Sequence, residues 1–226
     1  MIIGKGLIAK SLEGYDREGV VFIAAGVSNS KCFDAKEFDR EKMLVKELVE
    51  LHPDKKIVYF STLSILDPVM KHNPYVINKL YLEHFISENC NSYTIVRTSN
   101  LVGRGGNPNT IFNYLIDHVK NQKEFVLWKG SERNFILDDH FAQILNYIIN
   151  QNNKQELVNI YNPCNYDVAE LVKVIERFTG KIAKYKSKNI QSKLSNFSNE
   201  EALRYYNNLN IQIDNYLENI LHKILD

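Results

Sequence analysis

The stretch Val20-Val21-Phe22-Ile23-Ala24-Ala25 decides the fold, because it is a continuous apolar run rich in β-branched residues. Such a run indicates a strand that is buried on both faces of a parallel sheet. Apolar residues then recur at helical spacing over residues 36–51, and a second strand-like run follows at 56–60. Buried strands that alternate with amphipathic helices are typical of an α/β parallel sheet.

The same alternation continues on both sides of this stretch. We expect further strands at residues 1–3, 93–96, 125–128 and 157–161, and helices at 75–89, 109–120, 138–150 and 168–179. The tail from residue 181 is rich in Lys, Asn and Ser, and helical patterns return at 199–206 and 216–225. A chain of 226 residues suffices for one large domain, or for a domain with a small lobe.

Composition restricts the class of protein. A hydrophobic content of 44% and a charged content of 24% are ordinary for a globular protein. The net charge of +1 gives no polyanion-binding signature, so we expect no nucleic-acid partner. The three cysteines are widely spaced and the six histidines show no metal-ligand spacing, so we expect free thiols and no metal site. The longest apolar run is too short to span a bilayer, and we expect a cytoplasmic protein without membrane contact.

Tyr75 and Lys79 are four residues apart in an expected helix, so they share one of its faces. There an ammonium favours ionisation of the phenol and can hold a cofactor ribose, which makes the tyrosine a usable acid or base near neutral pH. The pair alone is a weak signal, because the chain has 13 tyrosines. A preceding strand that ends in Ser61-Thr62 gives it weight.

A glycine-rich turn, Gly4-Lys5-Gly6-Leu7-Ile8-Ala9, lies between the first expected strand and a short helix that ends near Leu12. In a dinucleotide-binding turn the first glycine permits the tight turn, and the second lets a pyrophosphate approach the backbone. The small third position lets the helix pack on the strand, and the helix N-terminus faces the phosphates. A glycine-rich turn without any ligand explains the motif alone about equally well.

The spacing after this turn departs from a regular cofactor site. A regular βαβ unit takes ~30 residues and places an acidic residue ~20 residues after the turn. The segment between Gly4 and Val20 is about half as long, and it offers only Asp16 or Glu18 as a substitute. Lys5 and Lys10 suit a 2′-phosphate, which favours NADP, although solvated surface lysines explain them equally well.

Taken in order, the motifs resemble those of the extended short-chain dehydrogenase/reductase family, which contains sugar-nucleotide epimerases, dehydratases and reductases. The resemblance extends over most of the chain. Besides the turn and the Tyr–Lys pair, it rests on four segments: Phe22-Ile-Ala-Ala-Gly26, Val58-Tyr-Phe-Ser-Thr62, Arg97-Thr-Ser-Asn100-Leu-Val-Gly103, and Arg133-Asn-Phe-Ile-Leu-Asp-Asp139. It implies a Rossmann-like doubly wound parallel sheet that lacks one or two N-terminal strands, with a small C-terminal substrate lobe. The cofactor domain would be residues 1–103, completed by residues around 135–165, and the lobe 104–134 and 166–226.

The resemblance also implies a role for each matching residue. The catalytic set would be Thr62, Tyr75 and Lys79, with Ser61 and Ser64 as alternatives to Thr62. The cofactor, NADP(H) in preference to NAD(H), would contact Gly4, Lys5, Gly6, Leu7, Ile8, Ala24, Ala25, Gly26, Lys79 and Ser99. A nucleotide sugar would contact Thr62, Asn100, Arg104, Asn109 and Arg133. A surface salt bridge with Asp138 or Asp139 is the competing interpretation of Arg133.

Three functions remain open at this point. Dehydratases of the family have Asp-Glu after the catalytic Thr, whereas Leu63 and Ser64 follow Thr62, so we discount dehydration. We prefer a reductase of a nucleotide-linked keto sugar in surface polysaccharide biosynthesis, because a reduced adenosine half-site fits a cofactor that is exchanged in every turnover. The alternatives are an NAD-dependent epimerase and a non-catalytic nucleotide-sugar-binding relative. The resemblance implies a homodimer through the helices at 36–51 and 75–89. In many family members the first of these helices also carries an asparagine that helps a proton-relay water. This helix has no clear equivalent and offers only Asp39 and Arg40.

Overall fold

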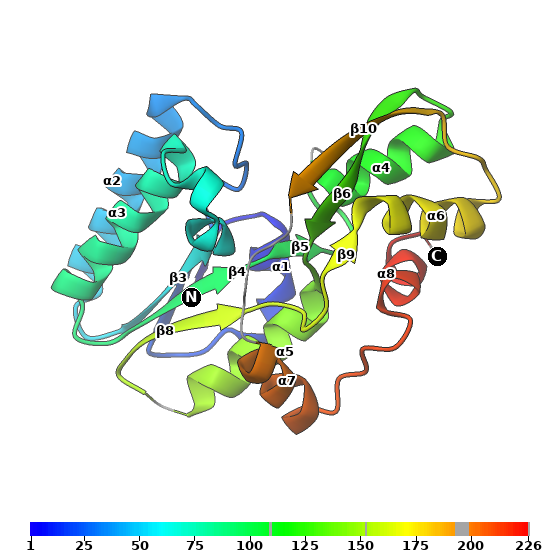
Figure 1. Ribbon diagram of the computed structural model, residues 1–226. Helices are drawn as coiled ribbons and strands as arrows, with labels where there is room; N and C mark the ends of the chain where they lie inside the picture. The colour runs from blue at the N-terminus through cyan, green and yellow to red at the C-terminus, as the bar shows by residue number, and fades with distance from the viewer. Residues whose placement is uncertain (109, 152, 193–198, 226) are drawn as a thin grey trace. The chain divides into compact units, whose positions relative to one another are not determined.

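The computed structural model describes residues 1–108, 110–151, 153–192 and 199–225, which form two compact units (Figure 1). Unit 1 consists of Met1–Ser99 and Phe141–Ile160, and unit 2 consists of Asn100–His140 and Tyr161–Asp226. The expected substrate residue Asn109 lies outside the described residues. No helix in the described part of the chain is both long and apolar enough to cross a membrane.

Unit 1 contains a five-stranded sheet in the order β1-β2-β3-β4-β8, and all four of its strand pairs are parallel. The predicted α/β parallel sheet is therefore confirmed. Every residue of β2 is buried, as its apolar sequence predicts. The strands are β1 (Ile2–Ile3), β2 (Val20–Ile23), β3 (Lys56–Thr62), β4 (Tyr93–Thr98) and β8 (Gln155–Ile160).

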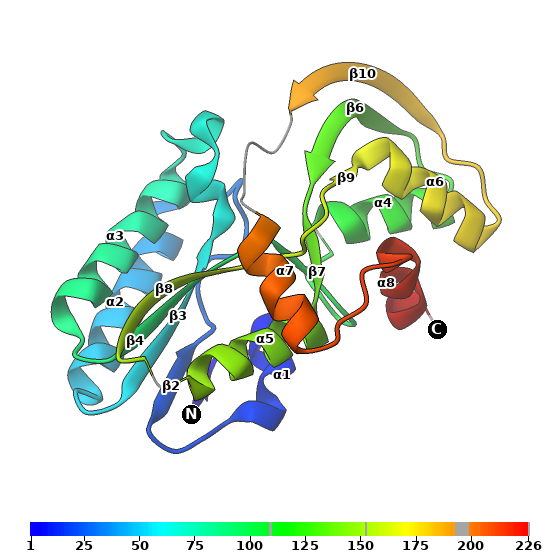
Figure 2. The same cartoon turned by 60° about the horizontal axis from the view of Figure 1, so that its bottom comes forward.

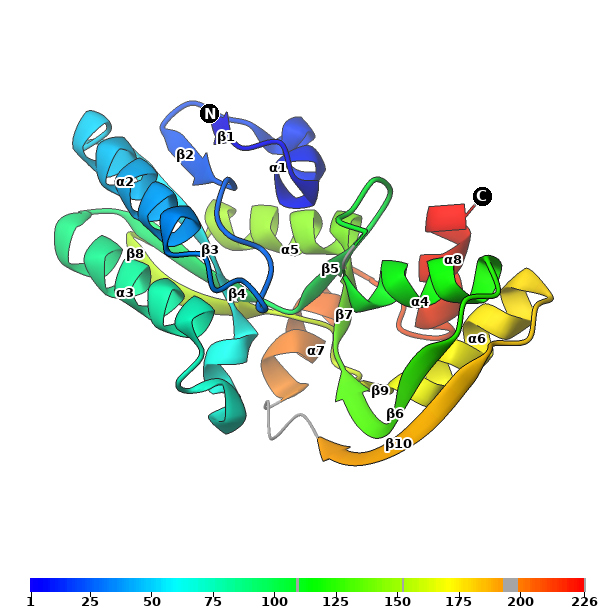
Figure 3. The ribbon, with the colours of Figure 1, turned by 90° about the horizontal axis from the view of Figure 1, so that it is seen from above.

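Helices cover both faces of this sheet, which is the doubly wound arrangement (Figure 3). On one face, α2 (Ala35–Leu51) and α3 (Pro74–Asn89) bury Val45, Leu48, Leu82 and Ile86 in a core cluster that also contains strand residues such as Tyr59. Fully burying one such side chain stabilises the fold by about 1.5–3 kcal/mol. On the other face lie α1 (Leu7–Ser11) and α5 (Asp138–Asn150), where the rings of Phe60 and Phe141 are 5.9 Å apart.

Side-chain caps fix where α2 and α3 begin. Asp34 accepts a hydrogen bond from the Lys36 backbone N–H (2.9 Å), and Asn73 accepts one from the Tyr75 N–H (2.9 Å). Pro74 occupies the first helical position, where its missing N–H costs nothing. Since capping contributes about 1 kcal/mol, Asn73 firmly sets the helical turn that carries Tyr75.

Strand β1 lies at an edge of the sheet, directly beside β2. Residues 4–19 are all described and form only α1 and the 3-10 turn η1 (Glu13–Tyr15), so the expected shortage of strands is confirmed. Arg17 donates hydrogen bonds to Asn146 and Asn150 of α5 and thereby ties this short connection to the sheet's covering helix. Asp16, a candidate for the missing acidic residue, pairs with the N-terminal ammonium at 2.8 Å.

Unit 2 contains a three-stranded sheet, in the order β10-β6-β9, and a two-stranded sheet of β5 and β7. Helix α6 runs alongside β6, with α4 and α8 next to it (Figure 2). Our prediction missed four of the strands in unit 2, β5, β7, β9 and β10, and made β6 too short. The elements are β5 (Asn100–Val102), α4 (Ile111–Lys120), β6 (Phe125–Arg133), β7 (Phe135–Leu137), β9 (Tyr166–Asp167), α6 (Val168–Thr179), β10 (Tyr185–Ser192), α7 (Asn199–Asn208) and α8 (Tyr216–Leu225).

An aromatic cluster around the buried Tyr216 hydroxyl links α7 and α8 of unit 2. The Tyr216 hydroxyl accepts the Leu137 backbone N–H (3.1 Å) and contacts Nδ1 of His140 (2.9 Å) and the Tyr206 hydroxyl (3.2 Å). Burial lowers the pKa of the His140 ring below its ordinary value, and this outweighs the opposing effect of the Asp139 carboxylate. The folded protein therefore favours the neutral imidazole.

We predict that His140 makes unit 2 less stable in mild acid. As pH falls through the unfolded-state pKa of His, ~6.5, the unfolded chain takes up a proton that the folded chain does not, until the lower folded-state pKa is reached. The free energy of unfolding, measured by urea titration, should therefore fall between pH 7.5 and 5. In His140→Gln the free energy of unfolding should fall less over this pH range than in the wild type. In the control variant His84→Gln, which changes an exposed histidine, it should fall as much as in the wild type. Identical pH dependence in the two variants would contradict the prediction.

Candidate functional site

Tyr75 and Lys79 both lie on α3 with their side chains buried, as the four-residue spacing predicts. The Lys79 ammonium is 5.8 Å from the centre of the Tyr75 ring and 5.0 Å from that of Tyr59. Thr62 ends β3, and in the parallel register it is paired with Thr98 at the end of β4. The three residues expected to be catalytic therefore belong to unit 1.

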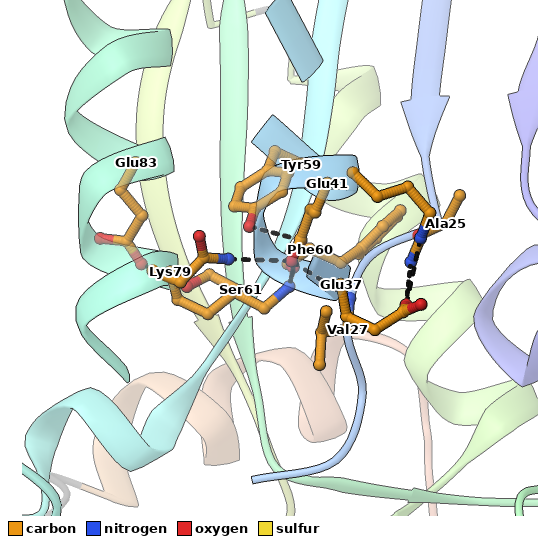
Figure 4. Close-up of polar contacts among 11 residues, drawn as sticks. Ala25, Val27, Glu37, Glu41, Tyr59, Phe60, Ser61, Lys79 and Glu83 are labelled. Atoms are coloured by element: carbon orange, nitrogen blue, oxygen red, sulfur yellow. Dashed lines mark hydrogen bonds and ion pairs between the residues drawn. The ribbon is translucent and has the colours of Figure 1, made fainter. Parts of the chain in front are cut away.

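A buried carboxylate, Glu41 of α2, holds the Lys79 ammonium (Figure 4). Oε1 of Glu41 accepts from Lys79 Nζ (2.7 Å) and from the Tyr59 hydroxyl (2.9 Å), while Lys79 also donates to the Phe60 carbonyl (3.1 Å). Burial, reinforced by the Glu41 carboxylate, raises the pKa of the Tyr59 hydroxyl well above its ordinary value. Tyr59 therefore stays protonated and acts as a donor.

The second oxygen of Glu41 is also satisfied. Oε2 accepts from the Val27 backbone N–H (3.1 Å) and from Nδ2 of Asn78 (3.0 Å), so donors on β3, α3 and the segment after β2 all meet at one carboxylate. Glu41 is fully buried. A buried charge is tolerated only when it is paired and hydrogen-bonded, and here both conditions are met.

Sequence reasoning missed Glu41, because it examined Asp39 and Arg40 of the same helix. A signal was present, since Glu41 falls between Phe38 and Val45 at the helical spacing of the buried face. An acidic residue within an apolar stripe indicates a buried partner for its charge. Arg40 instead pairs with Glu37 and donates to the Ala25 carbonyl (3.2 Å), two residues after the end of β2.

A second buried ion pair, between Glu83 of α3 and Arg97 of β4, lies next to the first. Arg97 Nε donates to Glu83 Oε1 at 2.9 Å, and Ser61 Oγ donates to the same oxygen at 2.5 Å. The Ser61 hydroxyl is thus already bonded to Glu83 in the core. The Thr62 hydroxyl, among the contacts found in the described chain, accepts only the N–H of nearby Ser64 (3.1 Å). This difference favours Thr62 over Ser61 as the residue that meets a substrate.

The glycine turn brings its backbone close to the end of β2. Gly4 has φ +138°, and a Cβ there would collide with the Ala24 carbonyl, so this position requires glycine. A Cβ on Gly6 would meet no atom within 4 Å, so the turn has an open side. Lys5 is exposed, and Leu7 and Ile8 begin α1, which has only five residues.

Two buried hydroxyls at the end of β4 have no hydrogen-bond partner within the described residues: Thr98 Oγ1 and Ser99 Oγ. A buried polar group without a partner costs about 1–3 kcal/mol and needs an explanation. Together with the open side of Gly6, these atoms fit a polar ligand along the ends of β1, β2 and β4. The pyrophosphate and nicotinamide parts of a dinucleotide fit the residues present, whereas residues 4–19 supply no strand for the adenosine side.

The expected substrate residues that are described, apart from Thr62, belong to unit 2. Arg133 Nη1 donates to Ser131 Oγ (2.8 Å) and to the Glu132 carbonyl (2.6 Å). Asn100 Nδ2 donates to the Asn134 carbonyl (2.9 Å), and Arg104 Nε donates to the Lys223 carbonyl (2.6 Å).

Asp138 pairs with Lys223 at 2.5 Å, and Asp139 pairs with the same lysine. A Cβ on Gly103 would collide with the Asp138 carboxylate, which explains a glycine at that position. Within the described part of the chain, no group of three or more His, Cys, Asp or Glu side chains is arranged to hold a metal ion.

Comparisons with known proteins point to one family. The model of the NAD dependent epimerase/dehydratase family matches residues 44–162, a little more than half of the chain. This match includes Thr62, Tyr75, Lys79 and Arg133 but begins after the glycine turn. No match was found among curated proteins.

Solved structures share the fold at low sequence identity. UDP-glucuronic acid 4-epimerase from Bacillus cereus, with UDP-glucuronic acid and NAD, is 17% identical with a TM-score of 0.70, covering 96% of this chain and 76% of that one. UDP-glucose 4-epimerase from Thermus thermophilus, with NAD, is 14% identical with a TM-score of 0.72, covering 97% and 82%. RMD from Pseudomonas aeruginosa, with NADPH, is 12% identical with a TM-score of 0.69, covering 92% and 80%.

We predict that Gly26→Ala disrupts the Glu41–Lys79 pair. The added Cβ would collide with the Glu41 carboxylate and lie 2.8 Å from Lys79 Nζ, so both charged groups must move. Overpacking of this kind costs about 1–3 kcal/mol, which urea denaturation can measure. The matched control is Gly14→Ala, because a Cβ there meets nothing within 4 Å. Equal stability of the two variants would show that the pair does not depend on Gly26.

Proposed function

The chain belongs to the NAD dependent epimerase/dehydratase family, and on this basis we propose that it is an NAD(P)H-dependent reductase of a nucleotide-linked keto sugar. The observation that carries the proposal is the buried Tyr75–Lys79 pair on α3, within one unit that also holds Thr62 at the end of β3. The choice of reduction is supported by the position of β1 at the edge of the sheet, because residues 4–19, which are all described, supply no further strand for the adenosine side. A cofactor held mainly by its pyrophosphate and nicotinamide parts exchanges readily between turnovers.

Each residue has a distinct task in this reaction. Thr62 donates a hydrogen bond to the sugar carbonyl oxygen, and Tyr75 gives that oxygen its proton. Lys79 already uses two of its three donors on Glu41 and Phe60, which leaves one for the nicotinamide ribose. The dihydronicotinamide, when bound, supplies the hydride, while the protein orients and polarises the reacting groups.

We assign the cofactor to unit 1 and the nucleotide sugar mainly to unit 2. Gly4, Gly6 and Ser99 would lie along the dinucleotide, since the turn is open at Gly6 and the Ser99 hydroxyl lacks a partner among described residues. Arg133 would meet the sugar diphosphate, because a guanidinium donates two parallel hydrogen bonds to such groups. Asn100 and Arg104 would contact the rest of the nucleotide. A role in surface polysaccharide biosynthesis, the preference for NADP(H) and a cytoplasmic location remain predictions.

An NAD-dependent epimerase is the second candidate. It is supported by similar folds whose names include UDP-glucuronic acid 4-epimerase and UDP-glucose 4-epimerase, both solved with NAD. Such an enzyme needs the same Tyr–Lys pair but retains its cofactor through both halves of the reaction. The amount of cofactor that stays bound to the protein during purification therefore separates the two candidates.

A homodimer through α2 and α3 is part of the proposal. These helices expose large apolar side chains, among them Met43 (71%), Ile77 (53%) and Leu80 (40%). A symmetric four-helix interface would bury these side chains.

We predict that Tyr75→Phe removes turnover and leaves cofactor binding nearly intact. The phenol is the proposed proton donor, and loss of such a group costs about 10²–10⁴-fold in rate. The control is Tyr81→Phe, on the same helix but 42% exposed, which should retain activity. Oxidation of NADPH or NADH in the presence of UDP-linked keto sugars measures turnover. An active Tyr75→Phe enzyme would refute the assigned acid.

We also predict that the purified protein carries little cofactor and binds added NADPH or NADH reversibly. Reduced nicotinamide fluorescence during titration measures this binding. Stoichiometric NAD in the purified protein would favour the epimerase. Absence of binding to NADPH, NADH, NADP⁺ and NAD⁺ would reject both enzymes in favour of a non-catalytic relative.

A further inference from the structure

Glu41 does more than fill a polar position in the core. Its four contacts are the Lys79 ammonium, the Tyr59 hydroxyl, the Val27 N–H and the Asn78 amide, at 2.7–3.1 Å. Four groups that can all donate are the surroundings of an ionised carboxylate. Glu41 and Lys79 therefore form a buried pair with no net charge.

Two other cations in this part of unit 1 are also paired with carboxylates. Arg97 pairs with Glu83 at 2.5 Å, and Arg40 pairs with Glu37 at 3.1 Å. The one charge that lies beside the Tyr75 ring, among the contacts of the described residues, is the Lys79 ammonium, and its carboxylate partner is only 2.7 Å away. Any ligand group placed near Lys79 thus meets a compensated charge rather than a bare cation.

This balance matters because the nicotinamide ring changes charge in the reaction. The oxidised ring is a cation and the reduced ring is neutral, so an uncompensated ammonium nearby would weaken binding of the oxidised form alone. We propose that Glu41 neutralises Lys79 so that the site binds both redox states of the cofactor, which makes Glu41 a determinant of redox-state preference. This inference rests on the proposed function, which places the nicotinamide ribose beside Lys79.

Glu41→Gln is the most conservative substitution for removing this charge, because glutamine keeps the shape of the side chain. In Glu41→Gln the amide oxygen can still accept from Lys79 and Tyr59, while the amide nitrogen would face two donors. One of them is Asn78, whose Oδ1 has no partner among the described residues. Rotation of the Asn78 amide would offer that oxygen to the new nitrogen. The substitution therefore removes the charge and preserves most of the hydrogen bonds.

The test measures the dissociation constants of NAD⁺, NADH, NADP⁺ and NADPH. The quantity compared is the dissociation constant of the oxidised cofactor divided by that of the reduced cofactor. Glu41→Gln should raise this ratio about tenfold, because Lys79 then repels the cationic ring. Lys79→Gln should lower it by a similar factor, and the double variant should return to within about threefold of the wild type. Tyr59→Phe removes a hydrogen bond to the same oxygen without changing charge and should leave the ratio unaltered.

Each outcome decides. An unchanged ratio in Glu41→Gln and Lys79→Gln, with both forms still bound, would overturn the inference while leaving the proposed function standing. If Glu41→Gln does not fold, the ratio must still rise from Lys79→Gln to the double variant. A purely structural role would weaken both redox forms equally, in Tyr59→Phe as in Glu41→Gln. Failure of the wild type to bind either form would reject the proposed function and this role of Glu41 with it.

Discussion

The buried ion pair of Glu41 and Lys79 is the interaction on which the rest of the site depends. It fixes α2, α3, β3 and the segment after β2 relative to one another, because each supplies a group that bonds to the same carboxylate or ammonium. Removal of either charge would leave the other buried without a partner, which typically costs about 3–5 kcal/mol. The position of the lysine next to Tyr75 is therefore set by tertiary structure rather than by α3 alone.

The fold of unit 1 was largely predictable, because most of its strands are apolar runs bounded by turn or loop residues. Unit 2 was less so. Strands β5, β7 and β9 have two or three residues, too few to show any periodicity. Strand β10 lies at an edge of its sheet and carries Lys186 and Lys188. Charged side chains are common on edge strands, but they interrupt the hydrophobic pattern by which a strand is predicted.

The candidate site was predictable in part. Thr62, Tyr75 and Lys79 were found because their order and spacing form a motif. Glu41 was missed because its significance lies in a partner 38 positions away, and sequence alone shows the charge but not the partner. The hydroxyls of Thr98 and Ser99 find no hydrogen-bond partner in the described part of the chain. This too is a property of packing, because no pattern of residue types indicates which polar atoms are left without a hydrogen bond.

The discontinuity of unit 1 has a consequence for how the chain is made. Strand β4 is completed by residue 98, but its neighbour β8 begins only at Gln155, after the chain has passed through Asn100–His140. During synthesis, β4 therefore presents an open edge of unpaired backbone groups while the intervening residues emerge. At ~5–20 residues per second, this interval lasts several seconds, and in it the nascent sheet is most exposed to pairing with other chains.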